Sequence, residues 1–307
     1  MKLVFLGTPQ FAVPSLEALV TAGHQVQAVF TQPDRPKGRG NTMAPSPVKE
    51  VSLRLGLPVL QPERIRKPEV VEQLAAMKPE VMVVVGYGQI IPQSIIDIPP
   101  RGIINVHASL LPKYRGAAPI QWAIANGETR TGVTTMRIDA GLDTGDMLLK
   151  WETEIAPEEN ALDLGARLAD AGAQLLIRTL EENPAGVKQN VADASYAPIL
   201  KKEDGRIDWS WEAQKIANRA RGFLPWPGAY TTFRGQLLHL WRCRPAIEQR
   251  CAPAALFHAA KRLYAGCGNS TVLEIFELQL EGRRRVSATD FLNGVRLSDN
   301  EILGAAS

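Results

Sequence analysis

The chain has 307 residues, of which 45% are hydrophobic and 22% are charged, and its formal net charge is +3. This composition is typical of a globular protein long enough for two domains. The longest apolar stretches, such as 81–85, fall far short of the roughly 18 to 20 residues that cross a bilayer. Residues 1–6 run directly into a Gly-Thr-Pro turn instead of a small-residue cleavage site, so we expect a cytoplasmic protein.

Charge is distributed unevenly along the sequence. Residues 1–200 carry 19 Lys and Arg against 21 Asp and Glu, a net −2, whereas residues 201–307 carry 16 against 11, a net +5. A basic C-terminal part favours an anionic partner, although a solvated basic surface would have the same composition.

The cysteines and histidines do not form a recognisable metal or disulfide pattern. Cys243, Cys251 and Cys267 are odd in number and spaced by 8 and 16 residues, which fits neither a disulfide framework nor a zinc site. None of the four histidines forms a ligand pair four residues apart. We expect reduced thiols and no metal.

The first part of the chain alternates between strand and helix patterns. Apolar runs predict strands over 2–6, 25–30 and 81–85, and the intervals between them predict helices over 11–22, 47–55 and 67–77. This alternation predicts βαβ units in an α/β domain with a doubly wound, mainly parallel sheet. The first turn, Gly7-Thr8-Pro9-Gln10, is not a G-x-G-x-x-G loop and therefore does not indicate a dinucleotide site.

Later segments complete this domain and begin a second one. Strands are expected over 102–106, 132–138 and 146–154, and helices near 120–125 and over 160–180, where Asn160 can cap the start. Residues 187–206 are polar and punctuated by Pro and Gly. We therefore expect a catalytic domain over 1–188, a linker over 189–206 and a second domain over 207–307.

The second domain has the pattern of a small β structure. Strands over 228–233 and 237–242 flank Arg234-Gly235 as a hairpin, and further strands are expected at 263–264, 271–280 and 284–287. A smaller C-terminal OB-like β-barrel is the expected architecture, and such barrels suit a basic module that faces nucleic acid. Four tryptophans lie among its arginines, and we interpret them mainly as core residues.

Asn105 and His107 are the first candidates for chemistry. They lie two residues apart at the end of an apolar run, so on a strand both side chains share one face. Asp143 follows 36 residues after His107, in a Gly-rich loop. An amide donor, a titratable ring and a carboxylate are the groups that acyl-type transfer needs. The alternative is a core histidine with satisfied hydrogen bonds at a strand end.

Two motifs accompany these three residues. Ser109-Leu110-Leu111-Pro112 follows Asn105-Val106-His107, and Asp143-Thr144-Gly145 follows the next expected strand. In this order and spacing, the sequence resembles the folate-dependent formyltransferases over essentially the whole chain. The resemblance implies a Rossmann-like formyltransferase domain, a transferase activity, and Asn105, His107 and Asp143 as catalytic residues.

The resemblance also implies the donor and its site. The formyl donor would be the co-substrate 10-formyltetrahydrofolate, without a metal, and Asp143 would favour the protonated form of His107. The folate would be bound by residues 109–112 and by the backbone around Gly86-Tyr87-Gly88 and Ile90. The glycines allow close approach of the backbone, and the aliphatic side chains supply an apolar wall for a flat ring.

The acceptor is indicated by a basic loop after the second expected strand. Arg35, Lys37 and Arg39 lie among Gly and Pro, and this loop resembles the one in the branch of the family that formylates methionyl-initiator tRNA for translation initiation. Flexible basic side chains can neutralise tRNA phosphates, with Arg39 the first choice and Arg283, Arg284 and Arg285 the second. A solvated loop is the alternative. The family analogy implies a monomer.

Other branches of the family share the same core. The enzyme that formylates glycinamide ribonucleotide is a single domain near 200 residues, so the extra basic region argues against it. The formyl-folate hydrolase and the nucleotide-sugar formyltransferases carry a comparable appended barrel and stay open as alternatives. An RNA-binding protein that has kept the sheet only as a scaffold would not need Asn105, His107 and Asp143.

Overall fold

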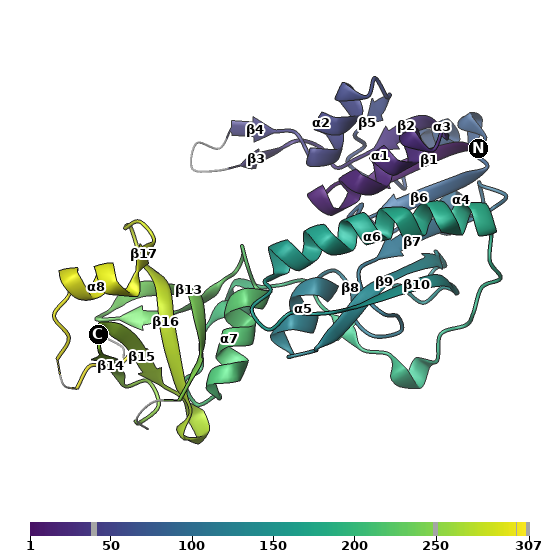
Figure 1. The fold of residues 1–307 in the computed structure, drawn as a ribbon. Helices are drawn as coiled ribbons and strands as arrows, with labels where there is room; N and C mark the ends of the chain where they lie inside the picture. Colours follow the sequence, from purple (N-terminus) through teal and green to yellow (C-terminus); the bar gives the residue numbers. More distant parts are fainter. Residues whose placement is uncertain (38–41, 248–250, 299, 305–307) are drawn as a thin grey trace. The chain divides into compact units, whose positions relative to one another are not determined.

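The computed structural model describes residues 1–37, 42–247, 251–298 and 300–304, and it separates into two compact units (Figure 1). Unit 1 contains residues 1–119, 130–154 and 165–198, and unit 2 contains 120–129, 155–164 and the described residues from 199 onward. The expected boundaries at 188 and 207 stay a prediction. Residues 189–198 of the expected linker belong to unit 1.

Unit 1 is built on a seven-stranded sheet in the order β10-β9-β7-β6-β1-β2-β5. The strands from β7 to β5 are parallel, and β9 and β10 run antiparallel at one edge. This confirms the mainly parallel, doubly wound sheet. The strands are β1 (Lys2–Gly7), β2 (Gln25–Phe30), β5 (Val59–Leu60), β6 (Val81–Val85), β7 (Ile103–His107), β9 (Arg130–Arg137) and β10 (Met147–Glu154).

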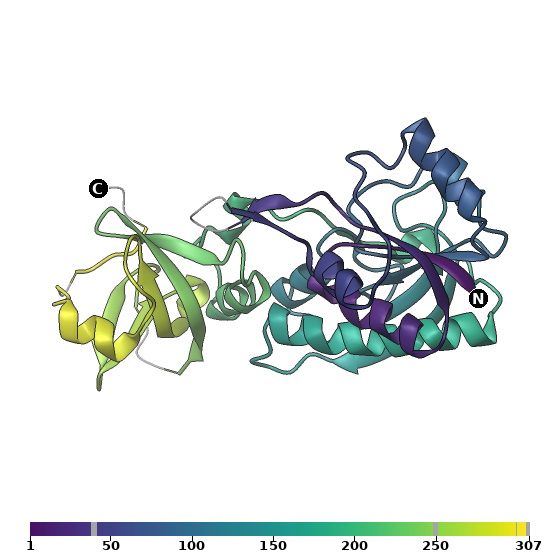
Figure 2. The same ribbon diagram turned by 90° about the horizontal axis from the view of Figure 1, so that it is seen from above.

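Helices cover both faces of this sheet, and α1, α2, α3 and α6 have bounds close to those expected, whereas α4 was not expected. They are α1 (Val13–Thr21), α2 (Pro47–Arg54), α3 (Pro68–Met77), α4 (Gln93–Ile96) and α6 (Ala161–Glu182), with the 3-10 turns η1 (Gln10–Ala12) and η2 (Val191–Asp193). Figure 2 shows α3 on the opposite side of the sheet from α1 and α6. Asn160 caps α6 as expected, because its Oδ1 accepts from the N–H of Leu162 at 2.8 Å.

The alternation of side chains along β1 and β6 builds the core on the α3 face. Val4 and Leu6 of β1 and Val84 of β6 are buried with Val70 and Leu74 of α3. A fully buried aliphatic side chain of this kind contributes roughly 1.5 to 3 kcal/mol. The core therefore fixes which residues of β7, two strands away from β1, face the same side.

Two short strand pairs of unit 1 were not expected from the sequence. β3 (Arg35–Lys37) and β4 (Thr42–Ala44) form an antiparallel hairpin at the base of the basic loop. β8 (Arg115–Gly116) pairs in parallel with β11 (Tyr196–Ala197), which lies inside the expected linker. The second pair ties the end of unit 1 to the segment that follows Ser109–Pro112.

Unit 2 contains an antiparallel sheet in the order β12-β13-β16-β15-β14, with β17 beside β16. This confirms a C-terminal β domain, and the β12–β13 hairpin turns at Arg234-Gly235 as expected. The strands are β12 (Ala229–Phe233), β13 (Gln236–Ala246), β14 (Leu256–Ala259), β15 (Arg262–Gly266), β16 (Val272–Leu280) and β17 (Val286–Ser287). The helical segments are α5 (Pro119–Ala125), α7 (Ala213–Gly222), α8 (Ala288–Gly294), η3 (Lys202–Gly205) and η4 (Gly268–Ser270).

Helix α7 was not predicted, although it supplies one wall of the core of unit 2. Ala213, Ile216, Ala217 and Ala220 are buried at the spacing of one helix face, with Leu240 of β13 in the same core cluster. Within the described residues, no helix is both long and apolar enough to cross a bilayer.

Candidate active site

Asn105 and His107 lie at the carboxyl end of β7, on the face that carries the α3 core. Asn105 pairs with Val84 of β6, so its side chain continues the row that Val84 begins. Only 9% of Asn105 and 6% of His107 is exposed. In open α/β sheets, ligands bind at this carboxyl edge, where the strand order reverses. Here the order reverses between β1 and β6, next to β7.

The carboxylate of Asp143 converges on both side chains. Asn105 Nδ2 donates to Asp143 Oδ1 over 3.4 Å, and His107 Nδ1 lies 3.7 Å from Asp143 Oδ2. The N–H of Gly116 also donates to Oδ2, at 2.8 Å. The three residues expected to act together therefore lie around one point.

The loop that carries Asp143 is tightly built. Asp139 Oδ1 accepts from the N–H of Gly141 at 3.0 Å and from Thr144 Oγ1 at 2.7 Å. A Cβ on Gly145 would lie 1.9 Å from the carbonyl oxygen of Arg137, so glycine is required there. Asp143 itself has a φ of 52°, an unfavourable value for a residue with a Cβ. Contacts around the loop must therefore hold this conformation.

The hydrogen bond of His107 to the backbone fixes the tautomer of its ring. Nε2 lies 2.9 Å from the carbonyl oxygen of Tyr114. Because a carbonyl oxygen only accepts, Nε2 carries a hydrogen, and Nδ1 is the nitrogen that faces Asp143. His107 can donate toward the site only when Nδ1 is also protonated.

Residues 109–112 form a buried turn next to His107. Thr134 holds the turn from both sides, since its Oγ1 accepts from the N–H of Leu111 at 3.1 Å and donates to the carbonyl of Ser109 at 2.7 Å. Lys150 Nζ donates to the carbonyl of Leu111 at 2.6 Å. Ser109 and Leu111 are 1% exposed, whereas Leu110 and Pro112 are partly exposed.

The segment after β6 has the backbone conformation that its glycines allow. Gly86 and Gly88 have φ values of 58° and 86°. Tyr87 between them is 1% exposed and packs in the α3 core, so only its backbone can contact a ligand; Ile90, by contrast, is 87% exposed. Burial raises the pKa of Tyr87 to about 12.

Two groups at the site were not expected from the sequence. One is the backbone N–H of Gly116, and the other is Gln189, whose side chain contacts the loop of Asp143. Gly116 lies in the Pro/Gly-rich loop that follows His107, whereas Gln189 belongs to no motif and is 46 residues from Asp143. Only the spacing of Gly116 after Ser109-Leu110-Leu111-Pro112 was a local signal.

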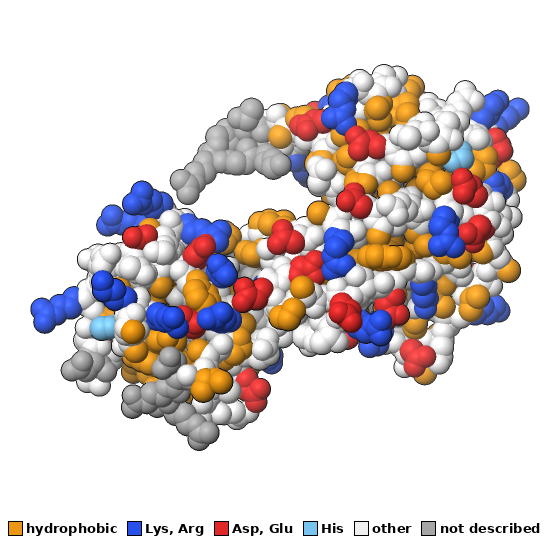
Figure 3. Space-filling view, in the orientation of Figure 1, with side chains coloured by type: hydrophobic (Ala, Val, Ile, Leu, Met, Phe, Trp, Pro, Cys, Tyr) orange, Lys and Arg blue, Asp and Glu red, His pale blue; other side chains and the backbone are white. Residues whose placement is uncertain are grey.

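The residues expected to contact tRNA are distant in the sequence from Asn105, His107 and Asp143. Arg35 is exposed on β3, the backbone of Lys37 ends that strand, and Arg39 lies outside the described residues. Arg283, Arg284 and Arg285 of unit 2 are exposed, and Arg285 forms an ion pair with Glu277 and lies over the ring of Trp241. Figure 3 shows Lys and Arg side chains, in blue, over unit 2.

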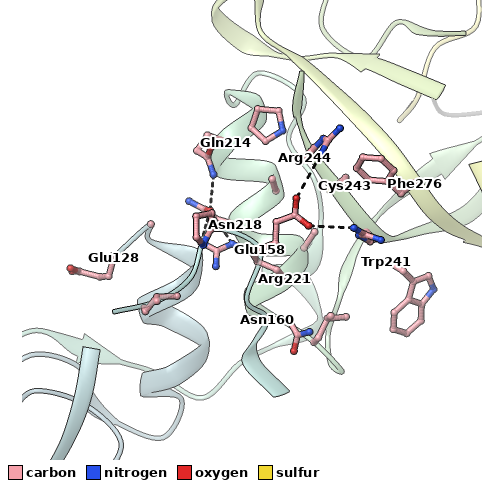
Figure 4. Close-up of a pocket in the computed structure, with 18 of the residues that line it drawn as sticks. Glu128, Glu158, Asn160, Gln214, Asn218, Arg221, Trp241, Cys243, Arg244 and Phe276 are labelled. Atoms are coloured by element: carbon pink, nitrogen blue, oxygen red, sulfur yellow. Dashed lines mark hydrogen bonds and ion pairs between the residues drawn. The ribbon is translucent and has the colours of Figure 1, made fainter. Parts of the chain in front are cut away.

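Unit 2 has a cavity of about 660 Å³, which holds none of the expected catalytic residues. Arg242 and Arg244 project from β13, and Glu158 lies between them, 3.3 Å from Arg242 Nη2 and 3.9 Å from Arg244 Nη1 (Figure 4). Arg221 donates to Asn218 Oδ1 in the same cavity. Its arginines therefore already have partners within the protein.

The cysteines of unit 2 are held as neutral thiols. Burial raises the pKa of Cys243 and of Cys267 to about 12. Across residues 1–37, 42–247, 251–298 and 300–304, no three or more His, Cys, Asp or Glu side chains cluster as a metal site would require.

A buried amide and imidazole and a partly exposed carboxylate thus lie together at the carboxyl edge of a doubly wound sheet, and the comparisons identify the family that has this fold. The model of the formyl transferase family matches residues 1–180, and that of the formyl transferase C-terminal domain matches 199–296. The chain belongs to the formyl transferase family.

Two relatives specify the branch of this family. Over 309 residues, the chain is 63% identical to the methionyl-tRNA formyltransferase of Solibacter usitatus, covering 99% of each chain. It is 57% identical over 312 residues to that of Koribacter versatilis, covering 100% of each chain. Among solved structures, a sugar 3N-formyl transferase, WlaRD, in the presence of dTDP and 5-N-formyl-THF, matches with a TM-score of 0.67 at 17% identity, over 92% of this chain and 99% of that one.

Proposed function

We propose that the chain transfers the formyl group of 10-formyltetrahydrofolate to the α-amino group of methionyl-initiator tRNA, which gives formylmethionyl-tRNA for translation initiation. The observation that carries the proposal is the convergence of Asn105, His107 and Asp143 next to residues 109–112. The full-length likeness to enzymes named methionyl-tRNA formyltransferase supports the choice of acceptor.

The reaction places specific demands on the site. The acceptor amine attacks the formyl carbon, a C–N bond forms, and the formyl oxygen becomes an oxyanion. The bond to the folate nitrogen then breaks, that nitrogen gains a proton, and the amine loses one. The site must therefore stabilise an oxyanion and transfer one proton.

Asn105 is the proposed first donor to the oxyanion. Its amide has two hydrogens, and the hydrogen bond to Asp143 is long at 3.4 Å, so at least one hydrogen is available for a ligand. His107 donates a second hydrogen bond from Nδ1 when its ring is protonated, because Nε2 is bonded to Tyr114. Both donors are buried, where hydrogen bonds to an oxyanion are strongest.

Asp143 is the proposed group that receives the proton of the amine, directly or through a water molecule. Its Oδ2 already accepts from Gly116, which orients the carboxylate, and 16% of its side chain is exposed. A carboxylate that is partly exposed can both pair with His107 and exchange a proton with an arriving substrate.

The donor would bind against residues 109–112, Ile90 and the backbone of residues 86–88. Leu110 and Ile90 are accessible apolar groups, and the two glycines leave the backbone open to a flat ring. The structure of WlaRD, which has the same fold, in the presence of 5-N-formyl-THF supports this donor class. No metal ion has a role in the proposed steps.

The acceptor tRNA would be bound by Arg35, Lys37 and Arg39 of the basic loop and by Arg283–Arg285 of unit 2. All six are basic, and tRNA phosphates are bound through such charges with a strong dependence on salt. We infer a monomeric cytoplasmic enzyme.

Acceptor assays with the purified chain and 10-formyltetrahydrofolate test this function. We expect formylation of methionyl-initiator tRNA, no transfer to a dTDP-amino sugar, and little formate release without an acceptor. Transfer to the sugar nucleotide would indicate a different acceptor, and rapid formate release would indicate a hydrolase. Tight tRNA binding without transfer would indicate an RNA-binding protein.

A further inference from the structure

Gln189 holds the loop that carries Asp143 with both hydrogens of its side-chain amide. Nε2 donates to the carbonyl of Asp143 and to the carbonyl of Gly145, each at 2.8 Å. The first of these acceptors is the carbonyl of Asp143, the residue whose φ of 52° needs support. The side chain is half-buried, and its two donors are therefore directed at the loop instead of at solvent.

The other end of the same amide is held by a buried arginine. Gln189 Oε1 accepts from Arg115 Nε at 3.0 Å and from Arg115 Nη2 at 2.7 Å. Only 3% of Arg115 is exposed, and among the described residues no acidic side chain forms an ion pair with it. A charged donor on the amide oxygen polarises the amide, which strengthens the hydrogen bonds that its N–H groups donate.

The same arginine lies beside the other partners of Asp143. Arg115 and Gly116 form β8, the N–H of Gly116 donates to Asp143 Oδ2, and the N–H of Arg115 donates to the carbonyl of Ser195 at 2.8 Å. Gly116 of β8 thus holds the carboxylate of Asp143. Gln189 holds its backbone carbonyl and is itself bound by Arg115 of the same strand. In the described part of the chain, the hydrogen bonds of the Arg115 and Gln189 side chains are to each other and to the backbone of the Asp143 loop, not to the side chains of Asn105, His107 or Asp143.

We propose that Gln189, oriented by Arg115, is a positioning residue that sets the Asp143 carboxylate for proton transfer. This inference rests on the proposed function, because it assigns the Arg115–Gln189 pair a task in that reaction. A displacement of about 1 Å at a reacting group can cost on the order of a hundredfold in rate, so loss of this support should lower kcat.

Gln189→Glu is the sharpest variant. It keeps the size of the side chain and its acceptors for Arg115, but it replaces the two N–H donors with an oxygen that faces two carbonyl oxygens. We expect kcat to fall about 10-fold to 100-fold, while KM for folate and for tRNA stays within about twofold. Gln189→Met, which is uncharged and of similar length, should give the same pattern and decides the question if Gln189→Glu does not fold.

Gln27→Glu is the matched control. Gln27 is half-buried in the same unit and donates from Nε2 to the carbonyl of Met77 at 2.8 Å, away from the site. It should lose thermal stability without a change in kcat. A merely structural role of Gln189 would give the same result as this control.

Amide hydrogen exchange of residues 139–146 in the full chain provides a readout that does not depend on turnover. The proposal requires faster exchange of this segment in both Gln189 variants, together with the loss in kcat. Unchanged exchange, or faster exchange with normal kcat, would overturn it. If the wild-type chain formylates no acceptor, the proposed function fails separately. Unchanged exchange in the variants would still contradict the claim that Gln189 stabilises the loop of residues 139–146.

Discussion

The polar groups of the two units differ in how they are held. At the edge of the sheet in unit 1, Asn105 and His107 are more than nine-tenths buried, and their hydrogen bonds are to fixed partners. In unit 2, Arg242 and Arg285 are about half exposed and pair with acidic side chains at the surface. Buried groups are little screened by salt, whereas exposed charges are screened within about 10 Å at moderate ionic strength. Substitutions of the buried polar groups at the β7 edge should therefore change the chemical step, and substitutions of the exposed arginines of unit 2 should change binding.

The largest effect is expected for Asp143→Asn. The amide keeps an acceptor for Gly116 but has no charge for His107 and cannot take a proton, so single-turnover formylation should fall by about 10² to 10⁴ with folate affinity retained. Rapid-quench measurements check this. Asp146→Asn, in the same loop, should be near normal. A near-normal rate for Asp143→Asn would remove the basis for placing the chemistry in unit 1.

The next largest effect is expected for Asn105→Ala. Loss of one donor to an oxyanion costs about 3 to 4 kcal/mol, or on the order of a hundred to a thousandfold in kcat. Steady-state kinetics at several salt concentrations would show whether this loss is independent of salt, as a buried group requires. A loss confined to KM would assign Asn105 to binding instead.

Replacement of Arg283, Arg284 and Arg285 by Ala tests the other side of the comparison. We expect KM for tRNA to rise with kcat unchanged, and the dependence of log affinity on log salt to become shallower by about one for each phosphate that is no longer neutralised. Arg285 should contribute least, because Glu277 already pairs with it. Arg178→Ala, which removes an exposed arginine that pairs with Glu182 on α6, is the control and should leave both quantities unchanged.

The smallest effect at neutral pH is expected for Tyr87→Phe. Tyr87 Oη is buried and has no hydrogen-bond partner among the described residues, so its loss should change the free energy of unfolding by less than about 1 kcal/mol.

At high pH, the free energies of unfolding of wild type and of Tyr87→Phe should diverge. An unfolded tyrosine ionises near pH 10, whereas the pKa of buried Tyr87 is raised to about 12. The contribution of the protonated phenol is complete below pH 10 and is lost as the pH rises through 12. Wild type should therefore lose up to about 2 kcal/mol relative to Tyr87→Phe across this window. Parallel unfolding curves from pH 9 to pH 12 would contradict the burial of Tyr87.

The sequence was most informative where local patterns decide structure. The strands at 25–30 and 81–85 have the expected bounds. Residues 81–85 are a continuous apolar run bounded by turns, which is typical of a buried parallel strand. Asn105 and His107 were found because the two-residue period of a strand places both on one face. The turn at Arg234-Gly235 was equally local.

Elements set by distant pairing could not be predicted in this way. β8 and β11 are two residues each and exist because residues 115–116 and 196–197 meet across the fold. Gln189 likewise gains its role only from hydrogen bonds with residues 46 and 74 positions away. Helix α7 differs from these elements, since its buried face of Ala and Ile has a helical period that is local to the sequence.

A crystal structure of the chain with 5-formyltetrahydrofolate would test the catalytic role of the β7 edge most directly. We predict that the pterin lies against residues 109–112 and that the formyl oxygen lies within hydrogen-bonding distance of Asn105 Nδ2, on the side of His107 that faces Asp143. A folate bound elsewhere, for example in the arginine-lined cavity of unit 2, with no ligand at the end of β7, would contradict this prediction.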